Sequence, residues 1–498
     1  MWATREWDNV DVSLIPSITL EQAVEIGFTY IGGQQQNDQF IELPHLEIIP
    51  FSRDGWDGTI GEGYEYHLVW AFSFRRPNYL NTWEFLVEAH SGELLALQDT
   101  NYYTTKKITG AIYPYTNDGC GVEGKAMMTP MIFADTGFSP PNQHTNLGGI
   151  YDYIAGWAIT NLYGLYSNIC DVSANDCTEY TGCSPIYEYS NTGDIDLEGR
   201  DGEHDKDYPL GHSEGDTFST RTVTYELGYL NAIARGWLNS QESNHFLDMQ
   251  LTSRVNDCGI SCNASYWIDD NMFLFGRSTD ECGNTGEILS LIDHEWGHAL
   301  DEHDANGTAM NPTEAFPDIV ANYRTYGSCV GRGLCIGLTT NYCYKPGFYC
   351  TAWHCPVQNS DSHFGHNCYQ YGDCCSDCTE IRDSDYAKHA SGMPHTISNW
   401  SCPVCGGIPH CAAIPVTEAA WDLVMRDLQS FPFNYDKNTA FEIGQRLLYT
   451  GSGNILNWYS SNCSSPDPYS GCNADSGYKQ WLAADDDNGD INDGTRRI

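Results

Sequence analysis

The segment 286–300 constrains the fold of this chain more than any other part of its sequence. It carries His294 and His298, with Glu295 directly after the first histidine. Apolar residues recur along the segment at helical spacing, and an Asn-x-x-Glu capping pattern at 284–287 precedes them, so we predict a helix. The two imidazoles then share one face and can bind one metal ion, while Glu295 can reach a water molecule at an open coordination position. A solvated helix that carries two histidines and an acid is the simpler alternative.

A third ligand distinguishes these two interpretations, because a catalytic zinc ion takes three protein ligands and keeps one position open. Pro312 suits the first position of a second helix with Asn311 as its cap, which places Glu314 and Asp318 one turn apart. We expect Glu314 to be the third ligand and Asp318 to accept a hydrogen bond from the imidazole of His294. Alternatively, Glu314 at the third helical position completes a capping box with Asn311.

The composition excludes several classes of partner. With 498 residues the chain is long enough for two or three domains, and 24 Lys and Arg against 67 Asp and Glu give a formal net charge of −43. So negative a chain repels nucleic acid and anionic membranes. The sequence contains no apolar run long enough to span a bilayer. We therefore expect a globular protein that binds neither nucleic acid nor a membrane. Helix patterns and strand patterns both occur along the chain, which predicts the α+β class.

The cysteines indicate the compartment. The chain has 21 of them at irregular spacing, which is typical of disulfides formed outside the cytosol, so we expect a secreted protein. The odd number leaves one thiol free or available for a bond between chains. The N-terminus lacks a charged stretch followed by an apolar region, so we expect any secretion signal to have been removed or to lie outside this sequence.

Changes in residue pattern along the chain predict five regions. They are a small α+β unit at 1–107, a β-rich linker at 108–155, a lobe at 156–328 that contains the two-histidine helix, a cysteine-rich insertion at 329–411 and a helical lobe at 412–498. The insertion holds twelve of the 21 cysteines. Its Cys-x-x-Cys pairs could bind a structural zinc ion, but in an oxidising compartment we favour disulfides.

The motifs occur in the order found in a known family. The His-Glu-x-x-His helix followed by Glu-x-x-x-Asp resembles the thermolysin and fungalysin clan of zinc metallopeptidases, the gluzincins, and most closely a group of secreted bacterial members. The stretch Asn263-Ala-Ser-Tyr-Trp267 is similar to the edge strand along which that clan aligns peptides, and 485–495 resembles the loop before its last helix. The stretch 83–95 resembles the last hairpin of the PepSY and fungalysin/thermolysin propeptide modules.

This resemblance implies a two-lobed zinc endopeptidase in which Glu295 is the general base. Asn263 and Ala264 would pair with the backbone of a protein or peptide substrate, and the N-terminal module would inhibit the enzyme as a propeptide. The family also places a histidine in its final loop to stabilise the oxyanion, where this chain has Asp490. A carboxylate cannot donate that hydrogen bond. Spacing does not choose among three possible donors elsewhere: His389, His395 and Arg497.

Two alternatives stay open at the sequence level. The first concerns Asp485, Asp487 and Asp490. Alternating oxygen ligands in a Gly-containing loop suit calcium, so these residues form either a calcium site or a solvated acidic loop. The second concerns the whole chain. It is either an active peptidase or an extracellular structural or assembly protein on a peptidase-like fold with weak or no catalysis.

Overall fold

The computed structural model combines helices and sheets, so the predicted α+β class is confirmed. It describes residues 12–52, 64–76, 82–99, 104–117, 124–173, 182–198, 212–238, 245–260, 262–279, 282–304, 307–309, 312–334, 382–388, 396, 409–459 and 476–486. The chain divides into two compact units. The smaller unit contains Met1–Thr105, Ser139–Gln143 and Asp152–Ile154, and the larger unit contains Lys106–Phe138, His144–Tyr151 and Ala155–Ile498.

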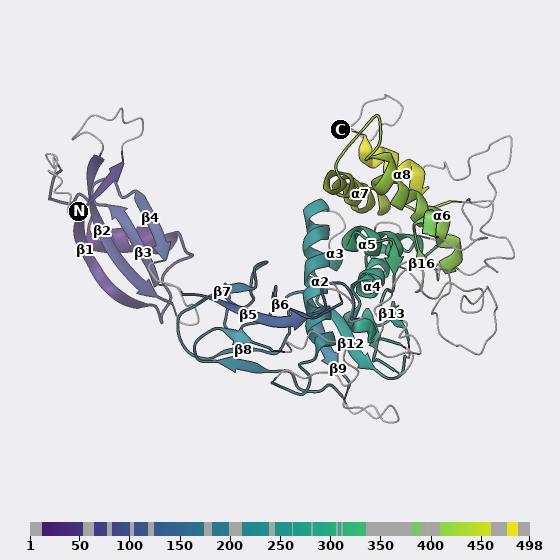
Figure 1. Cartoon of the computed structure of the whole chain (residues 1–498). Coiled ribbons are helices and arrows are strands. Elements are labelled where there is room, and N and C mark those ends of the chain that lie inside the picture. The colour runs from purple at the N-terminus through teal and green to yellow at the C-terminus, as the bar shows by residue number, and fades with distance from the viewer. Residues whose placement is uncertain are drawn as a thin grey trace, which may run out of the picture. The chain divides into compact units, whose positions relative to one another are not determined.

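The smaller unit contains one helix and one antiparallel sheet (Figure 1). The elements are α1 (Leu20–Thr29), β1 (Gln39–Ser52), β2 (Tyr64–Arg75), β3 (Thr82–Glu88) and β4 (Leu94–Asp99), with the strands in the order β1-β2-β3-β4. The Thr19-x-x-Gln22 pattern predicts a capping box, and Thr19 and Gln22 form it at the start of α1. Phe28 on α1 packs against Phe72 and Phe85 of the sheet, so the apolar stripe of the helix buries one face of the sheet.

The first part of the larger unit is made of short strands. They are β5 (Thr104–Ile112), β6 (Met127–Pro130), β7 (Ile150–Tyr153), β8 (Ala158–Thr160), β10 (Glu188–Ser190) and β11 (Ile195–Asp196). β5 pairs with β6, β7 and β11, and β8 pairs with β10. The stretch that the sequence predicted as a β-rich linker therefore contributes strands to a sheet.

A second sheet of the larger unit supports the site. Its strands are β9 (Ser167–Asp171), β12 (Leu251–Asp257), β13 (Ala264–Trp267) and β14 (Met272–Gly276), in the order β13-β14-β12-β9. The β12–β14 and β12–β9 pairs are parallel, whereas β13 runs antiparallel to β14 and forms an edge of the sheet. Helix α2 (Phe218–Trp237) lies against β9 and β12, and the short helix α3 (His245–Asp248) leads into β12.

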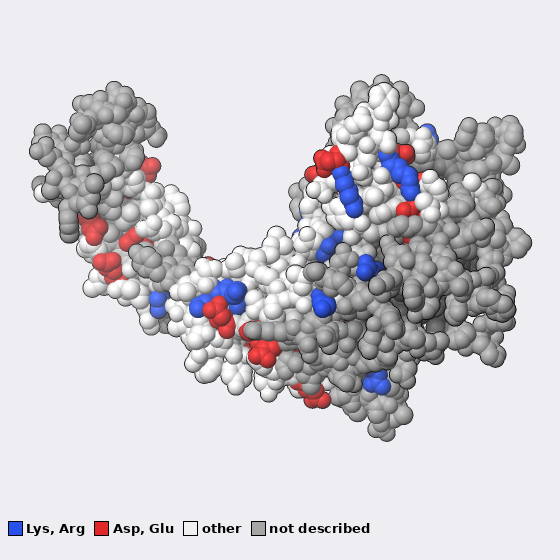
Figure 2. All heavy atoms as spheres, in the orientation of Figure 1, with Lys and Arg blue, Asp and Glu red and all other residues white. Residues whose placement is uncertain are grey.

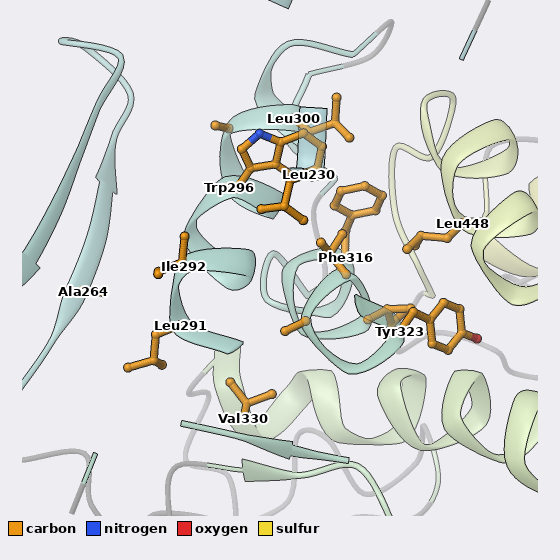
Figure 3. Packing of buried hydrophobic residues seen from close by; sticks show 14 of the residues in the cluster. Leu230, Ala264, Leu291, Ile292, Trp296, Leu300, Phe316, Tyr323, Val330 and Leu448 are labelled. Atoms are coloured by element: carbon orange, nitrogen blue, oxygen red, sulfur yellow. The ribbon is translucent and has the colours of Figure 1, made fainter. Parts of the chain in front are cut away.

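The remaining described elements are mainly helical. They are a 3₁₀ turn (Thr285–Glu287), α4 (Leu289–Glu302), α5 (Ala315–Thr325), the pair β15 (Cys329–Val330) and β16 (Arg382–Asp383), a 3₁₀ turn (Tyr386–Lys388), α6 (Pro409–Asp422), a π-helical turn (Leu423–Asp427), α7 (Lys437–Ser452) and α8 (Gly477–Asp485). One apolar core joins these helices to the sheet. Figure 3 shows part of it, with Trp296 and Leu300 of α4, Phe316 of α5 and Leu448 of α7.

The sequence also predicts a helix with a Thr439-x-x-Glu442 capping box and a return of helices after Pro415. Four predicted helix starts are wrong. The helix expected to start at Pro312 is α5, which begins at Ala315 with Glu314 as its N-cap. Asn284 caps the 3₁₀ turn, and α4 begins only at Leu289. α7 is capped by Asp436, not by Thr439, whose N–H donates to the Asp436 side chain. We also predicted that helices return after Pro415, but α6 begins at Pro409 and contains Pro415. Burial of the side chains around this proline against the core outweighs its local cost to the helix.

The surface of the described residues carries both signs of charge. On the face in Figure 2, Lys and Arg side chains are intermixed with Asp and Glu, and wide areas between them are uncharged. The acidic excess of the sequence therefore forms no broad single-sign patch on the described part of this face. In the described ranges, no helix combines the length and the apolar character needed to cross a membrane.

Candidate metal centre

Helix α4 places the two histidines and the adjacent glutamate at the site. Its other faces pack into the core, so most of the helix is enclosed: His294 is 4% exposed and Glu295 is 7% exposed. The one-turn spacing brings the Nε2 atoms of His294 and His298 to 3.1 Å from each other. The His298 side chain is 22% exposed. The site is therefore accessible from the His298 side and closed behind His294.

Glu314 joins the two histidines from α5. Its Oε2 atom lies 3.1 Å from Nε2 of His294 and 3.6 Å from Nε2 of His298, and the ligating atoms of the three residues all lie within 4.8 Å of one another. Glu314 is the residue that caps α5, but its side chain makes no capping hydrogen bond. The alternative in which Glu314 completes a capping box does not describe this arrangement, because its side chain is directed towards the histidines.

A close approach of α4 and α5 makes this meeting possible. A Cβ atom built on Gly297 would lie 2.6 Å from the Cα atom of Pro317, so only glycine fits at this crossing. Pro317 lies in the first turn of α5, where backbone N–H groups have no partner within the helix, so the proline removes no helical hydrogen bond. Gly297 has no side chain, and Pro317 needs no hydrogen-bond partner for a backbone N–H. These two residues thus allow α4 and α5 to come into contact between the predicted ligands.

The environment of Glu314 fits a metal ligand. Its Oε2 atom is buried and has no hydrogen-bond partner, although three imidazoles surround it. Burial raises the pKa of Glu314, but interactions with His294 and His298 outweigh burial and hold the pKa well below its usual range. A buried carboxylate oxygen that faces imidazole nitrogens without bonding to them is suited to bind a cation together with those nitrogens. Two nitrogen donors and one oxygen donor form a ligand set that zinc prefers.

Asp318 orients the first histidine, as its spacing predicted. Its Oδ1 atom lies 2.9 Å from Nδ1 of His294, so the imidazole donates from Nδ1 and keeps Nε2 for the metal. Burial opposes a positive charge on His294, but Asp318 and Glu314 outweigh burial and raise the pKa of His294 to about 9. The pocket therefore stabilises a positive charge at the position where a cation would bind.

Arg382 is a member of the site that sequence reasoning missed. The guanidinium of this buried side chain donates to both carboxylate oxygens of Asp318, with distances of 2.7 and 2.6 Å. Arg382 reaches this place because β16 pairs with β15, and Asn322 of α5 donates to Ser384 just beyond the strand. The planar guanidinium holds the carboxylate that orients His294. No motif or spacing marks this arginine in the sequence.

His410 is a second residue that sequence reasoning missed. It lies near the start of α6, and its Nε2 atom is 3.3 Å from Oε2 of Glu314. Burial, together with the nearby charge of Arg382, lowers the pKa of His410 to about 4, so the imidazole is neutral near pH 7. A proline directly before this histidine is typical of a helix start and was the available sequence signal. The three donors considered from the sequence, His389, His395 and Arg497, lie outside the described residues.

The remaining predicted residues are on other elements or lie outside the described residues. Asn263 and Ala264 lie at the start of the edge strand β13, where the Asn263 side chain is exposed and Ala264 is buried. Asp485 ends α8 and accepts a hydrogen bond from Arg446 at 2.8 Å. Asp487 and Asp490 lie outside the described residues, so the calcium interpretation stays a prediction.

The helix crossing can be tested by adding one methyl group. We expect Gly297→Ala to lower the free energy of unfolding by about 2 to 4 kcal/mol and to weaken zinc binding, because α4 and α5 must separate. The control is Gly236→Ala in α2, where no atom lies within 4 Å of the added Cβ and the change should stabilise by about 0.5 to 1 kcal/mol. Denaturant unfolding and zinc titration measure both effects. Equal stability of the two variants would contradict a tight crossing.

The role of Arg382 can be tested through metal affinity. We expect Arg382→Met to weaken zinc binding by roughly 10- to 100-fold, because Asp318 loses the partner that holds it against His294. The matched control is Arg446→Met, since Arg446 is also largely buried and pairs with Asp485, which is not among the three proposed zinc ligands. Competition with a chelator gives both dissociation constants. A zinc affinity that is the same in both variants would remove Arg382 from the site.

Comparison with known proteins adds no relative: no family model matches the sequence, and no curated protein matches it. The functional interpretation therefore depends on the motif and on the geometry of the site.

Proposed function

We propose that this protein is a zinc-dependent endopeptidase. The observation that carries the proposal is the meeting of His294, His298 and Glu314 around one point, with Glu295 on the same helix as both histidines. Two histidines and a carboxylate are a ligand set of catalytic zinc sites that cleave peptides. Within the described residues the group contains three ligands, which leaves a coordination position for water or substrate. A structural zinc site, in contrast, has four protein ligands.

Each residue has a distinct part in hydrolysis. A bound zinc ion supplies a Lewis acid that polarises the scissile carbonyl and lowers the pKa of the attacking water. Glu295 takes the proton from that water and passes it to the leaving amine. Glu295 directly follows His294 on α4 and is 7% exposed, which supports this role. Asp318 keeps His294 in the tautomer whose Nε2 is free.

His410 supplies the hydrogen bond that the sequence left unassigned. Its neutral imidazole lies beside Glu314 but is not one of the three ligands that gather within 4.8 Å. The side chain is 34% exposed, so it borders the space that a substrate enters. A neutral imidazole donates one N–H, and a donor at this place stabilises the negative charge that develops on the scissile carbonyl oxygen.

The rest of the proposal follows from the same site. An extended protein or peptide substrate adds to the free edge of β13, which packs beside α4. The helix-and-sheet arrangement of the larger unit supports a thermolysin-like fold, and the helix and four-stranded sheet of the smaller unit support an inhibitory propeptide module that makes the chain a zymogen. Disulfides in the larger unit support a secreted protein.

The proposal is tested by zinc content and by hydrolysis of an unstructured protein. We expect about one zinc per chain, and we expect Glu295→Gln to retain the zinc while kcat falls by roughly 10²- to 10⁴-fold, because the general base is lost. Glu302→Gln on the same helix is the control and should keep near-normal kcat. Wild type without zinc, or activity that survives in Glu295→Gln, sinks the proposal. Zinc without hydrolysis after removal of residues 1–105 favours the structural protein.

His410 makes a separate prediction. We expect His410→Gln to lower kcat by roughly 10²- to 10³-fold with little change in zinc affinity, because the residue acts on the transition state and does not hold the metal. A pre-steady-state assay and a zinc titration on the same variant separate the two effects. A large loss of zinc affinity with a matching loss of activity would instead make His410 a ligand.

A further inference from the structure

The free edge of β13 presents a defined set of backbone groups. The N–H of Gly276 donates to the carbonyl of Asn263 at 3.2 Å, and the register pairs Ala264 with Phe275 and Tyr266 with Phe273. Bonding alternates along an antiparallel pair, so Ala264 and Tyr266 direct their N–H and C=O groups away from β14. Asn263 was predicted to pair with substrate, but its carbonyl is already used within the sheet. Within the described part of the chain, the backbone groups of this edge that point away from β14 belong to Ala264 and Tyr266.

The first residues of this strand are attached to the segment that begins the metal-binding helix. Cys262, which is separated from β13 by Asn263, forms a disulfide with Cys282, and the two cysteines are 2% and 0% exposed. The hydroxyl of Thr285 donates to the same Asn263 carbonyl at 3.0 Å and lies 3.3 Å from the carbonyl of Gly276. A covalent bond and a buried hydroxyl thus join the strand to the 3₁₀ turn.

The other side of this attachment leads directly into α4. Thr285 begins the 3₁₀ turn, and the turn is followed by the helix that carries His294 and His298. The same helix packs against β13, and Figure 3 shows Ala264 on the strand beside Ile292 of the helix. Among the described residues, the edge strand is hydrogen-bonded to a neighbouring strand on one side only, so the attachment is its second fixed point.

We propose that the Cys262–Cys282 disulfide and Thr285 are positioning residues for peptide binding, an inference that rests on the proposed function. They hold the free edge of β13 at a set distance from the metal ligands. An extended peptide that pairs with Ala264 and Tyr266 then brings its scissile carbonyl to the metal without first ordering the strand. Recognition at this edge uses the peptide backbone, so the substrate class is extended polypeptide and the edge itself selects no side chain.

The experiment removes the attachment and leaves the ligands in place. The variant Cys262→Ala/Cys282→Ala is compared with Cys170→Ala/Cys183→Ala, which removes a disulfide at β9, the opposite edge of the same sheet. Both are made in the zinc-loaded full chain with Glu295→Gln, and the affinity for a labelled unstructured peptide is measured. We expect about tenfold weaker binding only in the first variant, with zinc affinity unchanged in both.

A milder pair of variants covers the case in which the disulfide variant does not fold. Thr285→Val keeps the shape of the side chain but loses the hydroxyl, whereas Thr285→Ser keeps the hydroxyl. In the active enzyme we expect Thr285→Val to raise KM about threefold to tenfold at nearly constant kcat, and we expect Thr285→Ser to restore KM. A role confined to stability would lower the unfolding temperature of Thr285→Val without changing KM.

The possible results separate this inference from the proposed function. Peptide affinity that is unchanged in Cys262→Ala/Cys282→Ala, or lowered equally by the Cys170 and Cys183 control, overturns the positioning role even if the enzyme is active. A wild-type chain that binds zinc and peptide but hydrolyses nothing overturns the peptidase proposal. In that case, weaker peptide binding by the Cys262 and Cys282 variant still supports the positioning of β13.

Discussion

The contact between α4 and α5 is the constraint on which the rest of the site depends. Gly297 has no side chain and Pro317 lies in a first helical turn, so the two backbones approach more closely than any larger residue at 297 would allow. This approach brings Glu314 to the two histidines of α4 and sets Asp318 behind His294. If the helices separated by the width of a methyl group, the carboxylate would leave the imidazoles. The same glycine therefore determines both the packing of the core and the geometry of the ligands.

The site is assembled from four segments that are distant in sequence. α4 and α5 supply the three proposed ligands, β16 supplies Arg382 and α6 supplies His410. Arg382 and His410 both lie within the predicted cysteine-rich insertion at 329–411. β16 is held by its backbone pairing with β15 and by the hydrogen bond from Asn322 of α5 to Ser384. Buried charges in this region are paired: Arg382 neutralises Asp318, which limits the cost of burying both. The result is a rigid and enclosed back of the site, with its exposed part near His298 and His410.

The proposed chemistry depends on residues within α4, and the proposed positioning of substrate depends on the segment directly before this helix. The histidines and Glu295 lie within the helix, whereas the 3₁₀ turn before it holds the edge strand through Cys282 and Thr285. One rigid helix thus connects the metal ligands to the surface on which a peptide would lie. Because catalysis is sensitive to small errors in the placement of the scissile bond, such a connection favours hydrolysis of extended chains.

The sequence by itself determined what depends on local spacing. His294 and His298 share a face because they are four residues apart on a helix with an apolar side, and the one-turn spacing of Glu314 and Asp318 together with a family resemblance made them the predicted partners. Tertiary structure decided the rest. Arg382 and His410 reach the site across long stretches of chain, and no periodic pattern predicts such contacts. Helix starts at Leu289 and Pro409 also differed from prediction, because burial in the core overrides the local capping pattern and the local cost of a proline.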